Sequence, residues 1–303
     1  MKLGVGLPMT GAWANPGSMR EVATRAEALG YDSLWTYQRL LHPVEDDLGS
    51  PYHSVLDPVT ALSYVAGVTS RVRLGLAIVN MPFYAPIVLS KALTTLDVVS
   101  SGRLDVGLGL GWSRPEFEAA GIPYERRGAR GEEFIACLRA IWTDPVVEFD
   151  GEFYRVPRSR VEPKPVQRPT PPILLGGTAD VALQRAGRIA DGWISSSRAD
   201  LTRMGESIAV VRSAAIEAGR DPAGLRFVVR GVVRLTDEPG PDDRKPLQGN
   251  ADQVREDLAS LARVGVTEVF LDLNYDERTT ADDVDAESGL ANALKTITAL
   301  APA

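Results

Sequence analysis

The chain has 303 residues, of which 44% are hydrophobic and 24% are charged, and its formal net charge is −7. This composition is typical of a soluble globular protein, and the acidic balance argues against nucleic acid as the main partner. The single cysteine, Cys137, rules out an intramolecular disulfide framework. No apolar run approaches the ~18 residues that a membrane span needs, and the opening MKLGVGLPMT is too short and too broken for a signal peptide. We therefore expect a cytoplasmic protein with no membrane partner.

Short apolar runs typical of buried strands alternate with amphipathic, helix-like segments along the whole chain. Local signals mark the helix boundaries: Gly30 ends the first helical segment, and Asp57 followed by Pro58 begins the second. Eight strands, each followed by a helix, predict an α/β fold of the (β/α)8 barrel type in a single domain covering residues 1–303. The expected strands are Lys2–Leu7, Ser33–Tyr37, Val72–Asn80, Leu104–Gly111, Ile173–Gly176, Gly192–Ser196, Arg226–Leu235 and Glu268–Asn274.

A long insertion interrupts the alternation between the fourth and fifth strands, from Trp112 to Pro172. It contains a helix around Cys137, a predicted β-hairpin that turns at Asp150-Gly151, and a proline-rich stretch that we interpret as a stiff extended connector. The segment 236–249 after the seventh strand is predicted to be a mobile surface loop. We expect substrate specificity to reside in three variable loops, at residues 41–55, 112–172 and 236–249.

Glycines alternate with larger apolar residues in two of the predicted strands. In LDVGLGLG, Gly107, Gly109 and Gly111 share one face, and LGVGL near the N-terminus repeats the pattern. We expect the leucine faces to pack against the outer helices, which leaves the glycines pointing into the barrel. Bulky residues normally fill that core, so the missing side chains predict room for a broad, flat ligand near the C-terminal rim. The alternative is that large residues of neighbouring strands, Trp35 among them, fill the space.

A glycine pair, Gly176-Gly177, stands where a strand ends and a helix starts in PPILLGGTADVALQRAGRIADGWISSS. Glycine at such a junction lets backbone N–H groups turn toward an anion above the helix N-terminus. The amides of Gly176, Gly177 and Thr178, which follow Leu175, are therefore candidates to hold a phosphate group. The plainer interpretation of the pair is a tight turn.

Few polar residues fall at the predicted rim. WTYQRLLHP places Gln38, Arg39 and His42 at and after the end of the second strand, and Asn80 ends the third. No carboxylate has a spacing that would complete a metal site with His42 and His53, so we expect no metal. The sequence also contains no nucleophile elbow, P-loop or zinc-binding helix pair. A redox cofactor is therefore the economical inference.

Four longer stretches follow one another along nearly the whole chain: EALGYDSLWTYQRLLHP, RVRLGLAIVNMPFYAPIVLSKALTTLDVVSSGRLDVGLGLGW, GEEFIACLRAIWTDPVVEFDGEFYRV and PPILLGGTADVALQRAGRIADGWISSS. In these stretches the chain resembles the bacterial luciferase-like oxidoreductases, and most closely their branch that depends on the deazaflavin coenzyme F420. The resemblance implies a (β/α)8 barrel that holds a flavin-like ring over the C-terminal ends of its strands. It also implies an oxidoreductase that transfers hydride between the deazaflavin and a small organic substrate.

The resemblance assigns positions to the cofactor. In this family a bulge with a non-proline cis peptide bond in the third strand supports the face of the ring, and the matching position is Ala77-Ile78. The family holds the cofactor phosphate on the backbone of the glycine pair after the fifth strand, so the turn and the anion-binding interpretations of that pair agree. The expected catalytic residues are Arg39 and His42, and the expected cofactor-binding residues are Gln38, Ala77, Ile78, Asn80, Gly111, Leu175, Gly176, Gly177 and Thr178.

The chain also departs from the family pattern. Many F420-dependent relatives carry an Asp-His pair at the end of the second strand, where this chain has Gln38-Arg39. The sugar-phosphate dehydrogenase branch has a glutamate just after the fourth strand, where Trp112 stands. A charged arginine cannot act as a base, although it can stabilise negative charge or orient a substrate carbonyl. These departures count against a glucose-6-phosphate dehydrogenase and leave the acid–base residue unassigned.

Two other functions stay open: an FMN-dependent monooxygenase of the same family, and a non-catalytic flavin-binding protein. The tail of F420 is acidic, so a basic exit path would favour it; Arg126, Arg127 and Arg130 are candidates, although a solvated helix face is the plainer interpretation. Members of the family usually dimerise through barrel helices. We therefore expect a homodimer in which APIVLSKALTTLDVV forms part of the interface.

Overall fold

The computed structural model describes residues 1–45 and 48–302 of the chain. Its central sheet is a closed ring of parallel strands, because β3 pairs with β2 on one side and with β5 on the other. One strand position of the ring is split into β3 and β4, with Ala77 and Ile78 between them. The strands of the ring are β1 (Lys2–Gly6), β2 (Ser33–Thr36), β3 (Arg73–Leu76), β4 (Val79–Asn80), β5 (Leu104–Gly109), β8 (Ile173–Gly176), β9 (Gly192–Ile194), β10 (Arg226–Val232) and β13 (Glu268–Asp272).

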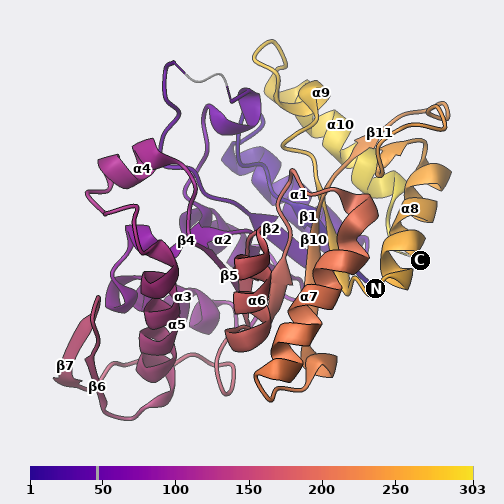
Figure 1. Ribbon diagram of the computed structural model, residues 1–303. Helices are drawn as coiled ribbons and strands as arrows, with labels where there is room; N and C mark the ends of the chain where they lie inside the picture. The colour runs from indigo at the N-terminus through magenta and orange to yellow at the C-terminus, as the bar shows by residue number, and fades with distance from the viewer. Residues whose placement is uncertain (46–47, 303) are drawn as a thin grey trace.

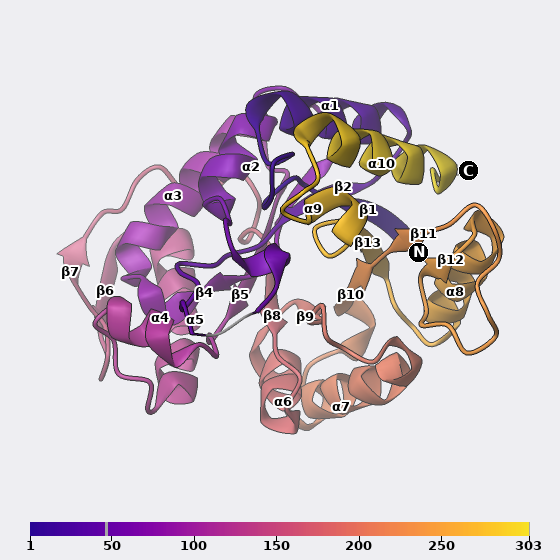
Figure 2. The same ribbon diagram turned by 90° about the horizontal axis from the view of Figure 1, so that it is seen from above.

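A helix follows each strand position of the ring, and Figure 2 shows these helices surrounding the strands. The predicted (β/α)8 barrel is confirmed. The start signals also hold: the side chain of Asp57 accepts a hydrogen bond from Thr60 N at 2.8 Å, and Pro58 is the first helical residue. The outer helices are α1 (Pro16–Ala28), α2 (Pro58–Ala66), α3 (Pro86–Val99), α5 (Arg127–Thr143), α6 (Asp180–Ile189), α7 (Met204–Glu217), α8 (Ala251–Arg263) and α10 (Ala286–Ala299).

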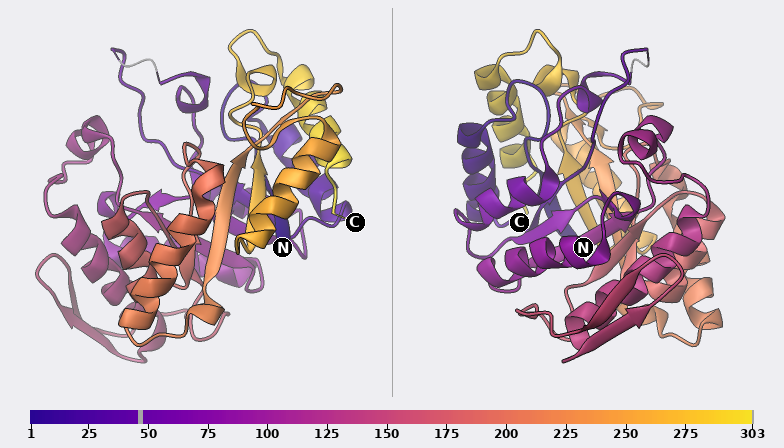
Figure 3. Two further views of the ribbon diagram at one scale, coloured as in Figure 1. Left: turned by 45° about the vertical axis from the view of Figure 1, so that its right-hand side comes forward. Right: turned by 90° about the vertical axis from the view of Figure 1, so that its left-hand side faces the viewer.

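The insertion between β5 and β8 has the predicted parts. The helix around Cys137 is α5, and it is preceded by the short α4 (Arg114–Ala119). The hairpin of β6 (Val147–Asp150) and β7 (Arg155–Ser159) is antiparallel and projects from one side of the molecule (Figures 1 and 3). Its turn is held by the carboxylate of Glu133, which accepts hydrogen bonds from successive backbone N–H groups of the turn.

The remaining elements are short. They are η1 (Ser50–Tyr52), η2 (Met81–Phe83), η3 (Leu201–Arg203), η4 (Pro222–Gly224), β11 (Arg234–Leu235), β12 (Gln248–Gly249) and α9 (Glu277–Thr280). The segment 236–249, predicted to be a mobile loop, is tied down in this structure. β11 pairs with β12, Arg244 forms an ion pair with Asp257 at 2.6 Å, and Leu247 is fully buried.

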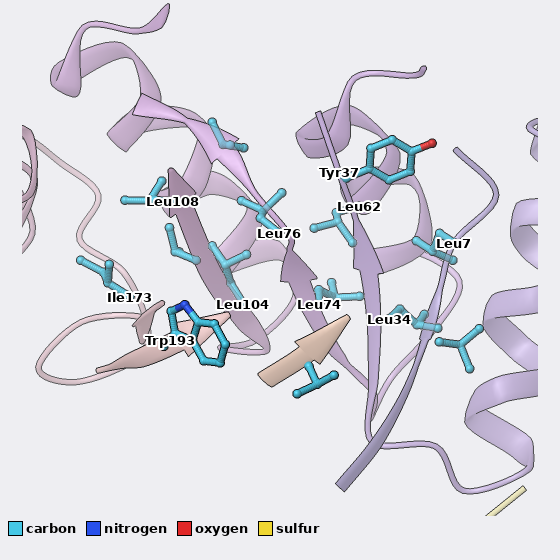
Figure 4. Close-up of a cluster of buried hydrophobic side chains, with 14 of the residues drawn as sticks. Leu7, Leu34, Tyr37, Leu62, Leu74, Leu76, Leu104, Leu108, Ile173 and Trp193 are labelled. Carbon is cyan, nitrogen blue, oxygen red and sulfur yellow. The ribbon is translucent and has the colours of Figure 1, made fainter. Parts of the chain in front are cut away.

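The main hydrophobic core lies between the strands and the outer helices. Leu104, Val106 and Leu108 of β5 are fully buried in this layer, as the alternation predicts. Figure 4 shows side chains from neighbouring strands joining the same cluster. Within the described residues, no helix is long and apolar enough to cross a membrane.

The surface of α3 is the place where the sequence predicts a homodimer contact. Val88 and Val99 are exposed on this helix. A groove of about 630 Å³ between α2 and α3 is lined in part by Ile87 and Val88. The homodimer itself stays a prediction.

A network of buried ion pairs closes the N-terminal end of the barrel interior. Asp105 is fully buried and accepts hydrogen bonds from Arg73 (Nε to Oδ2, 2.8 Å) and Arg226 (Nη1 to Oδ1, 2.6 Å). Arg226 also donates to Glu268 at 2.9 Å, and the other oxygen of Glu268 accepts a hydrogen bond from Trp35 Nε1 at 3.0 Å. Burial by itself would raise the pKa of Asp105, but hydrogen bonds and charge from Arg73 and Arg226 outweigh it and hold that pKa below its ordinary value.

Trp35 fills the middle of the barrel. Its ring stacks on Phe270 with centroids 5.2 Å apart and planes 17° apart. The space for this ring comes from glycines: a Cβ on Gly75 would lie 2.2 Å from Trp35 Cε3, and a Cβ on Gly4 would lie 3.0 Å from Nε1. At this level of the barrel the expectation of free room was therefore wrong, and the alternative that Trp35 fills it is confirmed.

We expect Asp105→Asn to lower the free energy of unfolding by about 3 kcal/mol, because it leaves two guanidiniums without their shared carboxylate. This is the low end of the cost of breaking a buried ion pair, since the side chains of Arg73 and Arg226 keep 26% and 22% exposure. Denaturant unfolding at neutral pH measures it. The matched control is Glu152→Gln, which breaks the exposed pair with Arg126 and is expected to change stability little.

The effect also has a pH dependence. The pKa of Asp105 is lowered in the folded state. Its ionised carboxylate therefore stabilises the fold above the unfolded-state pKa of ~3.9, and this stabilisation is lost as the pH falls through the folded-state pKa. The difference between wild type and Asp105→Asn should therefore persist at neutral pH and shrink only in strong acid. Equal losses for Asp105→Asn and Glu152→Gln would contradict this account of the barrel base.

Candidate active site

The C-terminal ends of the parallel strands open at one end of the barrel, which we call the mouth. In Figure 1 the loops at this end include α4 and α9, and the N-terminus lies toward the other end of the strands. Loops at the C-terminal face of a (β/α)8 barrel are where ligands bind in enzymes of this fold. All the predicted site residues belong to these strand ends or to the loops that follow them.

The break in the third strand position supplies the centre of the mouth. The peptide bond between Ala77 and Ile78 is cis, as expected. A Cβ on Gly109 would lie 1.9 Å from Ile78 Cδ1, and a Cβ on Gly176 would lie 3.3 Å from Ile78 Cγ2. A Cβ on Gly107 would lie 1.8 Å from the carbonyl oxygen of Leu76. These glycines therefore make room for the bulge and for Ile78, and not directly for a ligand as predicted.

Gln38 and Asn80 lie together beside this bulge. Gln38 Nε2 donates to Tyr84 Oη at 2.6 Å, and Gln38 Oε1 accepts from the backbone N–H of Asn80 at 2.9 Å. Burial and the charge of Asp57 raise the pKa of Tyr84, while the hydrogen bond from Gln38 opposes the shift. Gln38 thus fixes the end of the second strand against the end of the third.

The glycine pair after β8 forms a turn that only glycine adopts readily. Gly177 has φ +142°, and a Cβ there would lie 2.4 Å from the Cβ of Ala182 in the next helix. Trp193 Nε1 donates to the Gly177 carbonyl oxygen at 2.8 Å and holds the turn in place. α6 begins directly afterwards with Ala179 as its N-cap, which has no side-chain oxygen to accept the first N–H groups. These amides and those of the turn suit an anion.

Two of the predicted cofactor residues are packed against other parts of the protein. The side chain of Leu175 belongs to the hydrophobic core outside the barrel, so only its backbone is near the turn. Gly111 has φ +75°, and a Cβ there would lie 3.0 Å from Phe117 and 3.4 Å from Phe83. It therefore packs beneath α4 and η2.

Arg39 is buried at the mouth between two aromatic rings. Its Cζ lies 4.5 Å from the ring centroid of Trp112 and 5.2 Å from that of Tyr52. Its Nε is 3.5 Å from Glu116 Oε1, and that oxygen accepts the backbone N–H of Leu40 at 2.7 Å. In the described part of the chain, Arg39 Nε, Arg39 Nη2 and Glu116 Oε2 are buried without a hydrogen-bond partner. Such groups are rare and point to a bound partner.

His42, predicted as the second catalytic residue, packs against His53, with ring centroids 4.5 Å apart and planes tilted by 53°. Its Nδ1 is buried without a hydrogen-bond partner among the described residues. His53 Nδ1 lies 3.9 Å from a carboxylate oxygen of Asp282. No group of residues in the described ranges has the composition and geometry of a metal site.

Sequence reasoning missed an ion pair inside the mouth. Arg230 Nε donates to Asp272 Oδ2 at 2.6 Å, and the Arg230 guanidinium lies over the rings of Tyr37 (4.3 Å) and Tyr275 (4.9 Å). Burial would lower the pKa of Arg230, but Asp272 outweighs it and raises that pKa. Its Nη2 has no partner among the described residues. A charged residue at an inward position of the apolar strand RFVVRGV was the signal available in the sequence.

Burial also determines the protonation state of Tyr37, whose ring packs against the Arg230 guanidinium. Burial is the largest cause that raises the pKa of Tyr37, and nearby Tyr275 adds to it, while Arg230 opposes. Tyr37 is therefore a neutral phenol at physiological pH, and its hydroxyl donates to the carbonyl oxygen of Pro51 at 2.7 Å. This bond ties the loop that carries Tyr52 to the end of the second strand.

Comparison with known proteins identifies the class. The model of the luciferase-like monooxygenase family matches residues 2–240, and the chain belongs to that family. It is 36% identical over 233 residues to the uncharacterized protein Rv0953c of Mycobacterium tuberculosis, covering 76% of this chain and 74% of the relative.

Relatives with named activities use different cofactors. The chain is 31% identical to the F420-dependent glucose-6-phosphate dehydrogenase of Amycolatopsis mediterranei, over 64% of this chain and 58% of that enzyme. It is 35% identical to the FMNH(2)-dependent dimethylsulfone monooxygenase of Pseudomonas putida, over 46% of this chain and 39% of that enzyme.

Solved structures share the fold over nearly the full length. The monooxygenase RslO1 from Streptomyces bottropensis is 25% identical with a TM-score of 0.80, covering 99% of this chain and 98% of that chain. The coenzyme F420-dependent tetrahydromethanopterin reductase from Methanopyrus kandleri is 17% identical with a TM-score of 0.74, covering 97% and 98%.

The turn at the glycine pair yields a stability prediction. Gly177→Ala forces a side chain onto a backbone with φ +142° and against Ala182, and we expect it to cost on the order of 1–3 kcal/mol. Gly176→Ala is the matched control, because Gly176 has no positive φ and a Cβ there would come no closer than 3.3 Å to its nearest neighbour, Ile78 Cγ2. Thermal unfolding of both variants measures the difference. If Gly176→Ala destabilised as strongly as Gly177→Ala, the positive φ would not be the constraint.

Proposed function

We propose that this protein is an F420-dependent oxidoreductase that transfers hydride between the deazaflavin and a small organic substrate. The observation that carries the proposal is the contact between two features of the mouth. Ile78 presents an apolar surface at its centre, and the Gly176-Gly177 turn directly beside it presents backbone N–H groups next to the start of α6. A flat ring bearing a phosphate on a side arm matches this combination.

The residues at the mouth fit such a cofactor. Ile78 would support one face of the ring, and the amides of Gly176, Gly177 and Thr178 would hold the phosphate. Gln38 and Asn80, fixed to each other, would present amide groups at the edge of the ring. When bound, coenzyme F420 supplies the carbon that gives or receives the hydride.

Arg39 has a different role from the histidine common in F420-dependent relatives. A guanidinium has no acceptor atom, so Arg39 cannot act as a general base. Buried beside Glu116, it can orient an electron-rich oxygen of the substrate and stabilise negative charge that develops there. The aromatic rings of Tyr52 and Trp112 exclude water from one side of its guanidinium.

Charge near the start of α5 supports F420 over FMN. The start of α5 lies within reach of a side chain of α6, since a Cβ on Gly128 would be 2.9 Å from Arg185 Nη2. Arg127 packs on the ring of Tyr124 at 3.9 Å, and Arg130 donates to the carbonyl oxygen of Pro123 at 2.8 Å, so neither contact pairs these arginines with a carboxylate. Arg126 forms an ion pair with Glu152, so we do not include Arg126 in the proposed exit path. An acidic tail leaving the site would meet this basic surface.

The FMN-dependent monooxygenase remains the second candidate, because the Pseudomonas putida relative uses reduced FMN. Ring and phosphate sites serve both cofactors, so binding must be measured directly.

The test is to titrate the purified protein separately with F420 and with FMN and to follow the fluorescence of each cofactor. We expect a saturable response to F420 at lower concentration than to FMN, and weaker F420 binding by Gly177→Ala than by Gly176→Ala. Tight FMN binding with no response to F420 would overturn the cofactor assignment. Exchange of hydride with any carbonyl or enone substrate would eliminate a purely non-catalytic role.

A further inference from the structure

Two arginines of the mouth face the same pair of aromatic rings. Arg39, after the second strand, lies 5.2 Å from the ring centroid of Tyr52 and 4.5 Å from that of Trp112. Arg198, after β9, lies 5.7 Å and 5.9 Å from the same two rings. Three loops, after β2, β5 and β9, therefore bring two guanidiniums to the same two rings.

The two guanidiniums are incompletely paired. The side chain of Arg39 is only 5% exposed, yet its Nε and Nη2 make no hydrogen bond to the described residues. Arg39 Nε lies 3.5 Å from Glu116 Oε1, and this oxygen also accepts the backbone N–H of Leu40. Arg198 forms no side-chain ion pair or hydrogen bond with the residues that the structure describes. Among the described residues, Glu116 is the only carboxylate within 4 Å of either guanidinium.

Burying an arginine whose N–H groups are unmatched costs free energy, and a ligand that accepts those bonds recovers it. A guanidinium offers parallel N–H groups that fit the paired oxygens of a carboxylate or similar oxyanion. Tyr52 and Trp112 supply apolar area for the carbon skeleton of the same ligand. Trp112 is 53% exposed, so the place is reachable from solvent.

We propose that this cluster of Arg39, Arg198, Tyr52 and Trp112 binds an oxyanionic group of the substrate, so that the enzyme acts on small organic acids. The inference rests on the proposed function, which gives the cofactor phosphate its own site at Gly176–Thr178 and leaves the arginine pair to another oxyanion. Tyr52 and Trp112 belong to two of the three loops in which substrate specificity is expected.

The test uses butyrate as the probe and butyramide as its neutral isostere, at constant ionic strength, with the purified full chain. Tryptophan fluorescence follows binding, because Trp112 is half exposed whereas Trp13, Trp35, Trp142 and Trp193 are buried. We expect saturable quenching by butyrate and none by butyramide. Arg198→Gln, an exposed position that should leave the fold intact, should weaken butyrate binding about tenfold, and Arg39→Gln by at least as much.

The matched control is Arg212→Gln, which removes an exposed arginine over the ring of Phe227 at 5.2 Å, on the outer layer of the barrel. It should bind butyrate as wild type does. Equal binding of butyrate and butyramide, or equal loss in the Arg198 and Arg212 variants, would overturn the inference.

A parallel titration of Arg198→Gln with F420 and with FMN separates the two sources of an oxyanion. Unchanged cofactor affinity is expected if the cluster serves the substrate. A large loss of cofactor affinity with unchanged butyrate binding would assign the arginines to the cofactor instead. If neither cofactor binds even to wild type while butyrate does, the proposed function fails and the oxyanion site stands.

Discussion

Trp35 stacks on Phe270 in the middle of the barrel, and this stack forms the floor beneath the mouth where a ligand could bind. Beneath it, the ion pairs around Asp105 seal the base of the barrel. Above it, Ile78 covers the inward faces of neighbouring glycines. The interior is therefore filled by side chains, and a ligand is confined to the mouth. The buried arginine and glutamate atoms without a hydrogen-bond partner in the described ranges belong to Arg39, Glu116 and Arg230 at the mouth, where a ligand would meet them.

Much of the fold could be predicted from the sequence because each piece carries a local signal. The alternation of apolar runs with amphipathic segments identifies the barrel, Asp57 with Pro58 starts α2, and Asp150-Gly151 turns the hairpin. The glycine-rich strands were harder to interpret. Sequence alternation shows that glycines face inward, but it does not show what occupies the space, and Trp35 and Ile78 occupy it.

The polar part of the site was predicted less well, and the reason is distance along the chain. Arg230 pairs with Asp272 across neighbouring strands, and Arg39 lies near Glu116 of the insertion. Neither pair has a spacing that a sequence pattern reveals. Likewise, the ion pair between Arg244 and Asp257 holds the segment 236–249 in place, although the composition of that segment is typical of an irregular loop. The glycine pair was found from its place between a strand and a helix, and the structure shows the positive φ at Gly177. The break at Ala77-Ile78 was found because the family resemblance gave it a position, and the structure shows the cis bond there.

The central claim is that a planar redox cofactor lies on Ile78 with its phosphate on the turn at Gly177. A crystal structure of the protein grown with F420 tests it most directly. The account predicts electron density for the deazaflavin ring against the Ile78 side chain and phosphate oxygens within hydrogen-bond distance of the backbone nitrogens of Gly177 and Thr178. Density for the cofactor elsewhere on the molecule, or a phosphate held only by side chains away from this turn, would contradict it.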